Sequence, residues 1–237
     1  MQSVNLKIVS SSQMSAIEEK SVQLGISKDQ LMENAGLNLA RALKLQVGGS
    51  AGLKVLILVG PGNNGSDGLV MARYLAKWGA QVTVYLTDRR PEIDLKFISA
   101  LEYGVTSISS NDDPDFSKLY LSLKDCRLVV DSILGTGASR PLEGRLKDIA
   151  ITINYWRLIG SENQIVSVDL PTGVNPDSGE ADFASLDADY TFSLGFPKAG
   201  LFQFPGADYR GKLSVLDIGI PGDALDGTDI GLSLIHI

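Results

Sequence analysis

The stretch that decides the fold is Leu53-Lys54-Val55-Leu56-Ile57-Leu58-Val59-Gly60-Pro61-Gly62-Asn63-Asn64-Gly65-Ser66-Asp67-Gly68. Its first seven residues form a short, almost continuous apolar run, which is typical of a strand buried on both faces of a sheet. A glycine-rich turn follows over residues 60–67. Residues 68–78 then carry apolar side chains at helical spacing. A buried strand, a glycine-rich turn and a helix in this order predict a parallel sheet with a ligand crevice where its strands end.

The same alternation of strand and helix continues along the chain. Further strands are expected over residues 81–86, 106–109, 127–134, 164–170, 188–194 and 212–218. Helices are expected over residues 91–103, with Pro91 in the first turn, over 114–123, with acids in the first turn, and over 146–159. Two helices precede the first strand: one capped by Ser11 or Ser12 and ending at Gly25, and one over residues 28–46. The pattern predicts a three-layer αβα sandwich, with a Rossmann-like, mostly parallel sheet and helices on both faces.

Residues 1–222 are expected to form one domain, because no linker divides them. Residues 226–237 contain no complete predicted element, so we expect residues 223–237 to be a tail or a truncated linker.

Composition excludes several classes of function. The formal charge is −7 and the pI is about 4.7, which argues against a nucleic acid or an anionic membrane as the main partner. Cys126 is the single cysteine and His236 the single histidine, so Ser-His-Asp and Cys-His catalysis and a His-ligated zinc are not expected. No signal peptide and no apolar run of 18 residues is visible, which predicts a cytoplasmic protein.

The glycine-rich turn is the first candidate site. Gly60, Gly62 and Gly65 match the G-x-G-x-x-G pattern, and Asp88 follows the next strand at the spacing of a dinucleotide fingerprint. The start of the following helix offers unpaired N–H groups to a phosphate. Pro61, however, has no N–H to offer. An ordinary turn capped by an Asn or Asp side chain is the alternative.

Two further strands end in polar loops. Asp131 lies within an apolar strand, where a carboxylate is costly unless it is paired or hydrogen-bonded, and Arg140 follows as a natural partner for phosphate. Asp169 ends another strand, with the Thr172 hydroxyl three residues later. The alternatives are that Asp131 caps a neighbouring loop and that Arg140 is a solvated surface charge. Because parallel strands end at one edge of the sheet, we expect these side chains to converge.

Lys198, in Gly195-Phe196-Pro197-Lys198-Ala199-Gly200, is the last candidate. It could meet an anionic ligand or pair with an Asp. A surface lysine in a proline turn is the alternative.

In this order the motifs resemble a known family. They are Gly60 to Gly68, Val130-Asp131 to Gly144, Val168-Asp169-Leu170-Pro171-Thr172-Gly173-Val174, and Phe196-Pro197-Lys198 to Leu201, with Gln13-Met14 and Met32-Glu33-Asn34-Ala35-Gly36 before them. The chain is similar to NAD(P)H-hydrate epimerases, the YjeF N-terminal family that includes the apolipoprotein A-I-binding protein. The likeness extends over about residues 8–221.

The resemblance implies roles for particular residues. Asp169 would bind substrate. Because epimerisation is helped by a base near the substrate hydroxyl, we also expect Asp169 to be the catalytic base, with Lys198 as a weaker candidate for the proton partner. A potassium ion would be held by Asn64, Asp131 and Thr172. The remaining substrate contacts would come from Asn63, Asn64, Gly65, Ser66, Asp67, Gly135, Thr136, Gly137, Ala138, Ser139, Arg140 and Pro141. Ser66 replaces a usual glycine of the family, and Thr172 replaces a common serine but keeps its hydroxyl.

The activity implied by the resemblance is interconversion of the R and S hydrates of NADH and NADPH, called NADHX and NADPHX. One route opens the ring to an aldehyde and recloses it on the other face, and no redox cofactor is needed. The family also includes bifunctional enzymes with an ADP-dependent dehydratase domain, and a homodimer is compatible with the resemblance. Two alternatives stay open here: a Rossmann-type NAD-binding oxidoreductase that uses Asp88, and a non-catalytic nucleotide- or partner-binding module.

Overall fold

The computed structural model describes residues 3–88, 93–137, 141–226 and 231–236. Its main element is a seven-stranded parallel sheet with the order β4-β3-β2-β5-β6-β7-β8. The strands are β2 (Lys54–Val59), β3 (Gln81–Leu86), β4 (Thr106–Ser109), β5 (Leu128–Ser132), β6 (Gln164–Val168), β7 (Tyr190–Leu194) and β8 (Lys212–Leu216). All these strands were predicted to within about three residues at each end, and the α/β class is confirmed.

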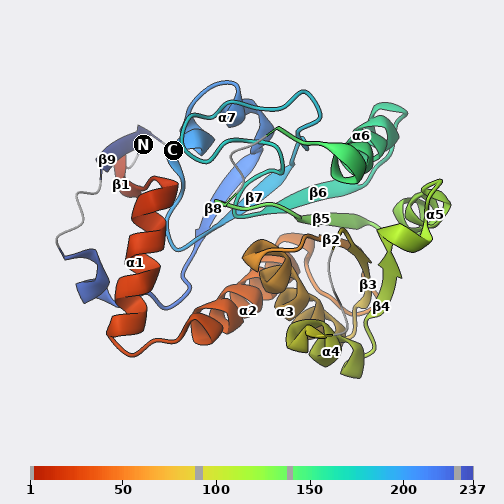
Figure 1. Cartoon of the computed structure of the whole chain (residues 1–237), viewed down its shortest axis with the longest axis horizontal. Coiled ribbons are helices and arrows are strands. Elements are labelled where there is room, and N and C mark those ends of the chain that lie inside the picture. Colours follow the sequence, from red (N-terminus) through yellow and green to blue (C-terminus); the bar gives the residue numbers. More distant parts are fainter. Residues whose placement is uncertain (1–2, 89–92, 138–140, 227–230, 237) are drawn as a thin grey trace.

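Helices cover both faces of this sheet, as Figure 1 shows. The helices are α1 (Ser11–Gln23), α2 (Lys28–Val47), α3 (Asn63–Lys77), α4 (Leu95–Glu102), α5 (Ser117–Asp125), α6 (Gly144–Leu158) and α7 (Gly206–Tyr209). Side chains alternate along the strands, so Val55 and Ile57 of β2 pack with α1 to α4, whereas Leu56 and Leu58 pack with α5 and α6. The two apolar clusters are the two interfaces of the predicted three-layer sandwich.

Three helix starts differ from the prediction in their caps or first-turn residues. Ser10, rather than Ser11 or Ser12, caps α1, in a capping box with Gln13. The start of α4 at Leu95 is capped by Asp94, and the Pro91 that was expected in its first turn lies outside the described residues. The first turn of α5 contains no acid. That helix begins at Ser117. The Asp113 carboxylate, which precedes the helix, accepts hydrogen bonds from two backbone N–H groups of the first helical turn.

The largest difference concerns the glycine-rich turn. Helix α3 begins at Asn63, five residues earlier than expected, so Asn63 to Asp67 form its first turn. Only Gly60 to Gly62 remain as the connection from β2. The backbone at position 60 passes so close to Ile133 that only glycine fits, because a Cβ there would lie 1.9 Å from the carbonyl oxygen of Ile133. Asn and Asp favour turns, and they are also good residues near a helix start, which is why their pattern was misread.

The chain ends pair with each other instead of lacking structure. Strand β1 (Ser3–Ile8) runs antiparallel to β9 (Gly231–His236) as a separate two-stranded ribbon. The expectation that residues 226–237 contain no complete element was therefore wrong. Among the described residues, no helix is both long and apolar enough to cross a membrane.

The Met32 to Gly36 motif joins helices to one another. Glu33 on α2 forms ion pairs with Arg73 of α3 and, at 2.6 Å, with Lys96 near the start of α4. The Asn34 amide donates to the carbonyl of Ile218, after β8, at 3.0 Å. These contacts hold α2 against α3, α4 and the last strand.

Gly36 allows α2 and α3 to touch, and this leads to a stability prediction. A Cβ at Gly36 would lie 2.4 Å from the Val70 Cβ and 2.9 Å from the Met71 backbone nitrogen. Alanine gains about 1 kcal/mol of helix propensity over glycine, whereas overpacking costs about 1–3 kcal/mol. Because the backbone must move, we expect Gly36→Ala to lower the free energy of unfolding in urea by about 1–2 kcal/mol. The control is Gly222→Ala, where a Cβ meets nothing within 4 Å; equal effects of the two changes would contradict the prediction.

Candidate functional site

The polar loops meet at the carboxyl edge of the sheet. Strands β2, β5, β6 and β7 are consecutive neighbours in the sheet, so the loops after them lie side by side. The chain moves outward from β2 through β3 to β4 and then returns to β5 on the other side of β2. Such a reversal opens a crevice outside the strand ends, which is where open α/β sheets bind ligands.

Asp131 holds two of these loops together. It is the penultimate residue of β5 and has no exposed surface. Its carboxylate accepts hydrogen bonds from the Ser167 hydroxyl at 3.0 Å, the Thr172 backbone N–H at 2.8 Å and the Thr172 hydroxyl at 2.7 Å. Burial raises the pKa of Asp131, and the hydrogen bonds from Thr172 and Ser167 oppose that effect. The carboxylate therefore fixes the loop after β6 to the end of β5.

Asn64 is joined to this pair through the backbone of one residue, Leu134. Its Nδ2 donates to the Leu134 carbonyl at 3.0 Å, while the Leu134 N–H donates to the Thr172 hydroxyl oxygen at 3.2 Å. The Asn64 Oδ1 is buried and has no hydrogen-bond partner within the described part of the chain. A buried unpaired carbonyl costs about 1–3 kcal/mol, so this oxygen is suited to contact a positively charged group.

The donor set beside Asn64 fits a hard cation. An amide oxygen, a carboxylate and a hydroxyl are the ligands that such ions prefer, and transition metals favour nitrogen and sulfur instead. Within the ranges that the structure describes, no three His, Cys, Asp or Glu side chains cluster as a metal site. Gly135 leaves space for the amide, because a Cβ there would come within 3.3 Å of the Asn64 Cγ.

Asp169 and Lys198 form a buried ion pair beyond the ends of β6 and β7. The Asp169 Oδ1 accepts from the Lys198 ammonium and from the Leu194 N–H, the latter at 2.9 Å. Lys198 is 1% exposed and also donates to the Leu194 carbonyl at 3.0 Å. No described donor reaches Oδ2 of Asp169. Asp169 has a left-handed backbone, with φ of +68°, and such strain in a residue other than glycine is typical of functional sites.

A pocket of about 470 Å³ lies against this ion pair. One wall comes from the loops after β2, β5 and β7, and another comes from α1 and α2. Its lining includes Met14, Glu18, Lys28, Leu31, Met32, Ala35, Asn63, Asn64, Asp67, Gly135, Thr136, Gly137, Asp169 and Lys198.

The predicted site residues fall into three groups. Asn63, Asn64, Asp67, Gly135, Thr136, Gly137, Asp169 and Lys198 line the pocket. Asp131 and Thr172 lie buried beneath it, while Gly65, Ser66 and Pro141 are not among its lining residues. Ala138, Ser139 and Arg140 lie outside the described residues. Every described candidate residue thus lines the pocket or lies beneath it, except Gly65, Ser66 and Pro141.

The start of α3 faces this pocket. Its N-cap residue, Gly62, supplies no side-chain hydrogen bond to the first turn, and Gly62, Asn63 and Asn64 line the pocket. The first N–H groups of a helix lack intrahelical partners and attract anions. This arrangement agrees with the expected phosphate site, except that the helix starts at Asn63 rather than after Gly65.

Helices α1 and α2 contribute residues that the sequence analysis missed. Glu18 lies four residues after the buried Met14, on the same side of α1, and both line the pocket. Burial raises the pKa of Glu18, with Lys198 opposing and Asp169 adding to that effect. The helical spacing from Met14 was the available signal, but it does not show which other segment α1 would face.

Asp88 does not take part in the pocket. It follows β3, is exposed, has φ of +48° and is not among the lining residues. A dinucleotide fingerprint needs this acid beside the ribose of a ligand that also lies on the glycine-rich turn. Its position thus gives no support to the oxidoreductase alternative.

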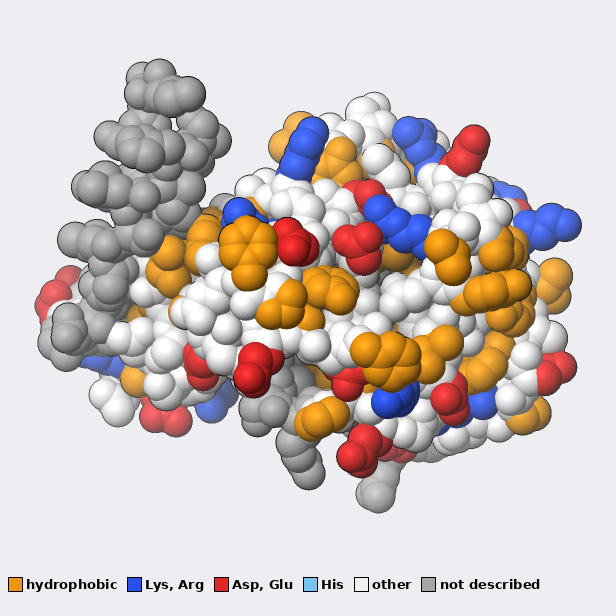
Figure 2. Space-filling view, turned by 90° about the horizontal axis from the view of Figure 1, so that it is seen from above, with side chains coloured by type: hydrophobic (Ala, Val, Ile, Leu, Met, Phe, Trp, Pro, Cys, Tyr) orange, Lys and Arg blue, Asp and Glu red, His pale blue; other side chains and the backbone are white. Residues whose placement is uncertain are grey.

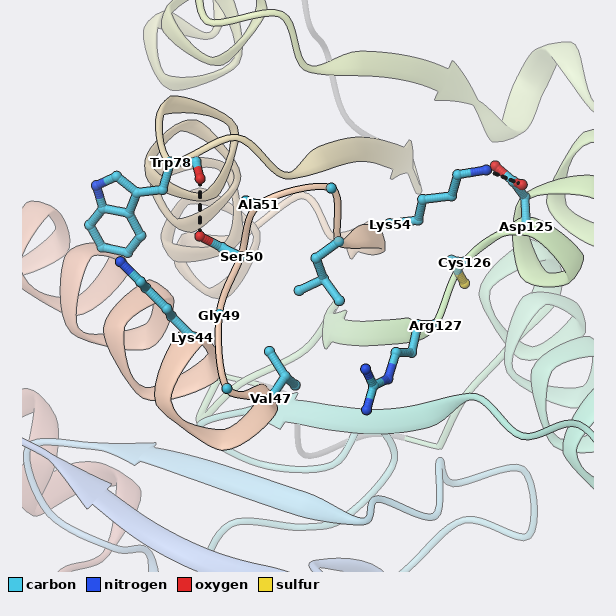
Figure 3. Close-up of a pocket in the computed structure, with 13 residues that line it drawn as sticks. Lys44, Val47, Gly49, Ser50, Ala51, Lys54, Trp78, Asp125, Cys126 and Arg127 are labelled. Carbon is cyan, nitrogen blue, oxygen red and sulfur yellow. Dashed lines mark hydrogen bonds and ion pairs between the residues drawn. The ribbon is translucent and has the colours of Figure 1, made fainter.

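A second hollow, of about 780 Å³, lies at the opposite edge of the sheet (Figure 3). There Lys44 lies over the Trp78 ring, 5.2 Å from its centroid, and Lys54 pairs with Asp125 at 2.6 Å. Burial raises the pKa of the Cys126 thiol in its wall to about 12, so the thiolate is scarce at neutral pH. The hollow is large, but its charged groups are mostly satisfied by their neighbours and no buried acid faces it.

Comparison with known proteins identifies the family to which this chain belongs. Residues 28–200 match the family model described as YjeF-related protein N-terminus. A bifunctional NAD(P)H-hydrate repair enzyme Nnr of Thermofilum pendens is 34% identical over 93% of this chain, and the match covers 42% of that protein. The corresponding Nnr of Dictyoglomus turgidum is 35% identical, with 44% of its length covered. The chain thus spans about two fifths of these bifunctional relatives.

Shorter relatives match over their whole length. An NAD(P)H-hydrate epimerase of Elusimicrobium minutum is 32% identical over 93% of this chain and 99% of that protein. Among solved structures, the crystal structure of yeast ynu0, YNL200c, is 28% identical and superposes with a TM-score of 0.77, covering 94% of both chains.

The buried ion pair allows a prediction about stability. Lys198→Met leaves Asp169 buried without its cation, which costs about 3–5 kcal/mol of unfolding free energy. The matched control is Lys54→Met, which breaks an ion pair whose side chains are 42% and 68% exposed and should cost less than about 1 kcal/mol. Urea denaturation of both variants measures the difference. Replacing both buried partners, as Asp169→Leu with Lys198→Met, should restore part of the loss; equal costs for the two single variants would contradict the assignment.

Proposed function

Because the chain belongs to the family of YjeF-related protein N-termini, we propose that it is an NAD(P)H-hydrate epimerase, an isomerase that interconverts the R and S forms of NADHX and NADPHX. The observation that carries this proposal is the pocket at the carboxyl edge. It combines a helix start that has no side-chain cap, suited to a diphosphate, with a carboxylate whose second oxygen is free to act on a substrate. The bifunctional relatives support the same chemistry for this part of their length.

The chemistry requires a base but no redox group. The damaged cofactor carries a hydroxyl on the carbon beside the ring nitrogen, and epimerisation must break and remake a bond at that carbon. We assign Asp169 as the base that takes the hydroxyl proton through Oδ2, since Oδ1 is held by Lys198 and Leu194. Lys198 keeps Asp169 in place, with the Leu194 carbonyl as its second partner. The substrate phosphates would lie at the start of α3, near Asn63 and Asn64.

Potassium is the proposed bound ion, with Asn64, Asp131 and Thr172 as its protein ligands. The buried unpaired oxygen of Asn64 supports this part of the proposal, and so do the carboxylate and hydroxyl joined to it through Leu134. When bound, the ion would supply positive charge beside the diphosphate. These residues also position the Gly135 to Gly137 loop against the pocket.

The domain extent, location and assembly are also proposals. Residues 1–222 would form the epimerase domain and 223–237 a tail or linker, in a cytoplasmic protein whose compartment cell fractionation would test. A homodimer is supported by four exposed apolar side chains along the outer side of α6, namely Ile151, Tyr155, Leu158 and Ile159. Figure 2 shows apolar side chains gathered at the end of the molecule where Figure 1 places α6. The mass in solution, from sedimentation, tests the homodimer.

The activity has a direct test. The purified chain should interconvert the R and S hydrates, followed by chromatography, faster than the spontaneous background. Asp169→Asn keeps the shape of the side chain and removes its basicity, so the rate should fall by about 10²–10⁴-fold. A full rate for Asp169→Asn above the background would make Asp169 a binding residue only.

The potassium site predicts an ion-dependent stability. KCl should raise the thermal midpoint relative to tetramethylammonium chloride at equal ionic strength, because an ion at about 100 times its Kd stabilises by about 2.7 kcal/mol. Asn64→Ala removes the unpaired oxygen and should abolish this difference. Asn38→Ala, which removes a half-buried amide on α2 that donates to the Asp217 carbonyl, should retain it. Equal midpoints of the unaltered protein in the two salts would exclude the ion.

A further inference from the structure

The pocket contains a second buried carboxyl group, in surroundings that contrast with those of Asp169. Asp67 lies in α3, one turn after Asn63, and is 9% exposed. It lines the same pocket as Asp169 and Glu18. Within the described chain, no hydrogen bond or ion pair to the Asp67 carboxyl is found, although a buried polar group normally has such a partner. The missing partner is supplied if a bound molecule hydrogen-bonds to Asp67.

The surroundings of Asp67 favour its neutral form. Burial raises its pKa well above the usual range, and the negative charges of Asp169 and Glu18 raise it further. Lys198 and Lys96 act in the opposite direction, but their ammonium groups are already paired with Asp169 and with Glu33. One pocket therefore contains an ion-paired carboxylate and a second carboxyl group whose surroundings favour the neutral acid. Environments that separate two carboxyl groups in this way divide the roles of base and acid between them.

The proposed ring opening needs both roles, and this step rests on the proposed function. When the hydroxyl proton moves to Asp169, the C–O bond becomes a carbonyl and the bond from that carbon to the ring nitrogen breaks. The bonding electron pair goes to the nitrogen, which must gain a proton to leave as a neutral group. We propose that Asp67 is the catalytic acid that protonates the ring nitrogen of the hydrate while Asp169 deprotonates its hydroxyl.

The return step balances the reaction. After the aldehyde rotates, the nitrogen attacks its other face and gives its proton back to Asp67. Asp169 returns the other proton to the oxygen, so the product differs from the substrate only in configuration and both carboxyl groups regain their starting states. Lys198 is not needed as a proton donor, because its ammonium is held by the Asp169 carboxylate and the Leu194 carbonyl.

The acid role predicts a particular pH dependence. Because Asp67 must be protonated in the free enzyme, kcat/KM should fall as the pH rises through the raised pKa of Asp67. The charged groups that influence this limb are Glu18 and Lys28 from α1 and α2, Lys96 from α4, and the Asp169–Lys198 pair.

The test compares Asp67→Asn with the unaltered protein and with Asp125→Asn, an exposed aspartate at the opposite edge of the sheet. Asparagine can donate a hydrogen bond but cannot release the proton, so kcat for hydrate interconversion should fall about 10²–10⁴-fold. KM should change by less than about threefold, and the fall in rate at high pH should disappear. Asp125→Asn should keep the rate and the profile. Thermal melting of each variant checks its folding.

The outcomes separate the two proposals. If Asp67→Asn retains most of the rate while the unaltered protein is active, the acid role is wrong and the epimerase function stands. If Asp67→Asn does not fold, the pH profile of the unaltered protein decides, and a profile without a fall at high pH overturns the acid role. If the unaltered protein shows no interconversion above background, the epimerase function and the acid role both fail.

Discussion

The arrangement of the site depends on one buried carboxylate, that of Asp131. A charge without exposed surface is tolerated only where several donors surround it, and here they come from β6 and from the loop that follows. Because Thr172 uses both its N–H and its hydroxyl on Asp131, the path of the chain after β6 is fixed within a few residues of Asp169. The register between β5 and β6 thus sets the position of Asp169.

The pocket contains two carboxyl groups that are buried in different surroundings. Asp169 receives a cation and a backbone N–H, whereas Asp67 receives no protein partner and faces other acids. The first arrangement stabilises a carboxylate and the second stabilises its neutral form, so the difference lies in the surroundings alone. Helix α1 contributes to it through Glu18, although α1 lies far from these residues in the sequence.

The sequence predicted the sheet well because buried parallel strands have an unmistakable signature: apolar runs such as residues 54–59 and 128–130, separated by helices. The sequence also predicted that Asn64, Asp131 and Asp169 lie at one edge of the sheet, since parallel strands end on the same side. The start of α3 was misplaced because Asn63 and Asn64 have the composition of a turn. Only tertiary packing decides whether such residues join the following helix.

Other features depend on contacts between distant segments and left no local signal. The pocket wall formed by α1 and α2 is one, and the β1–β9 ribbon, which pairs Ser3–Ile8 with Gly231–His236, is another. The Met32 to Gly36 motif contributes to the family resemblance, but its residues alone did not predict a structural role. Its role in the structure is to fasten α2 through Glu33 and Asn34, and to bring it against α3 at Gly36.

The single thiol has a practical consequence for spectroscopy of this protein. Cys126 lies at the edge of the sheet opposite the pocket, and its pKa of about 12 keeps it almost entirely protonated at neutral pH. Reagents such as maleimides and iodoacetamides attack thiolates, so they modify this residue slowly. A cysteine introduced on the exposed outer side of α1 would therefore be labelled first without deletion of the native one. A dye or spin label at that position would test whether α1 moves when a ligand enters the pocket.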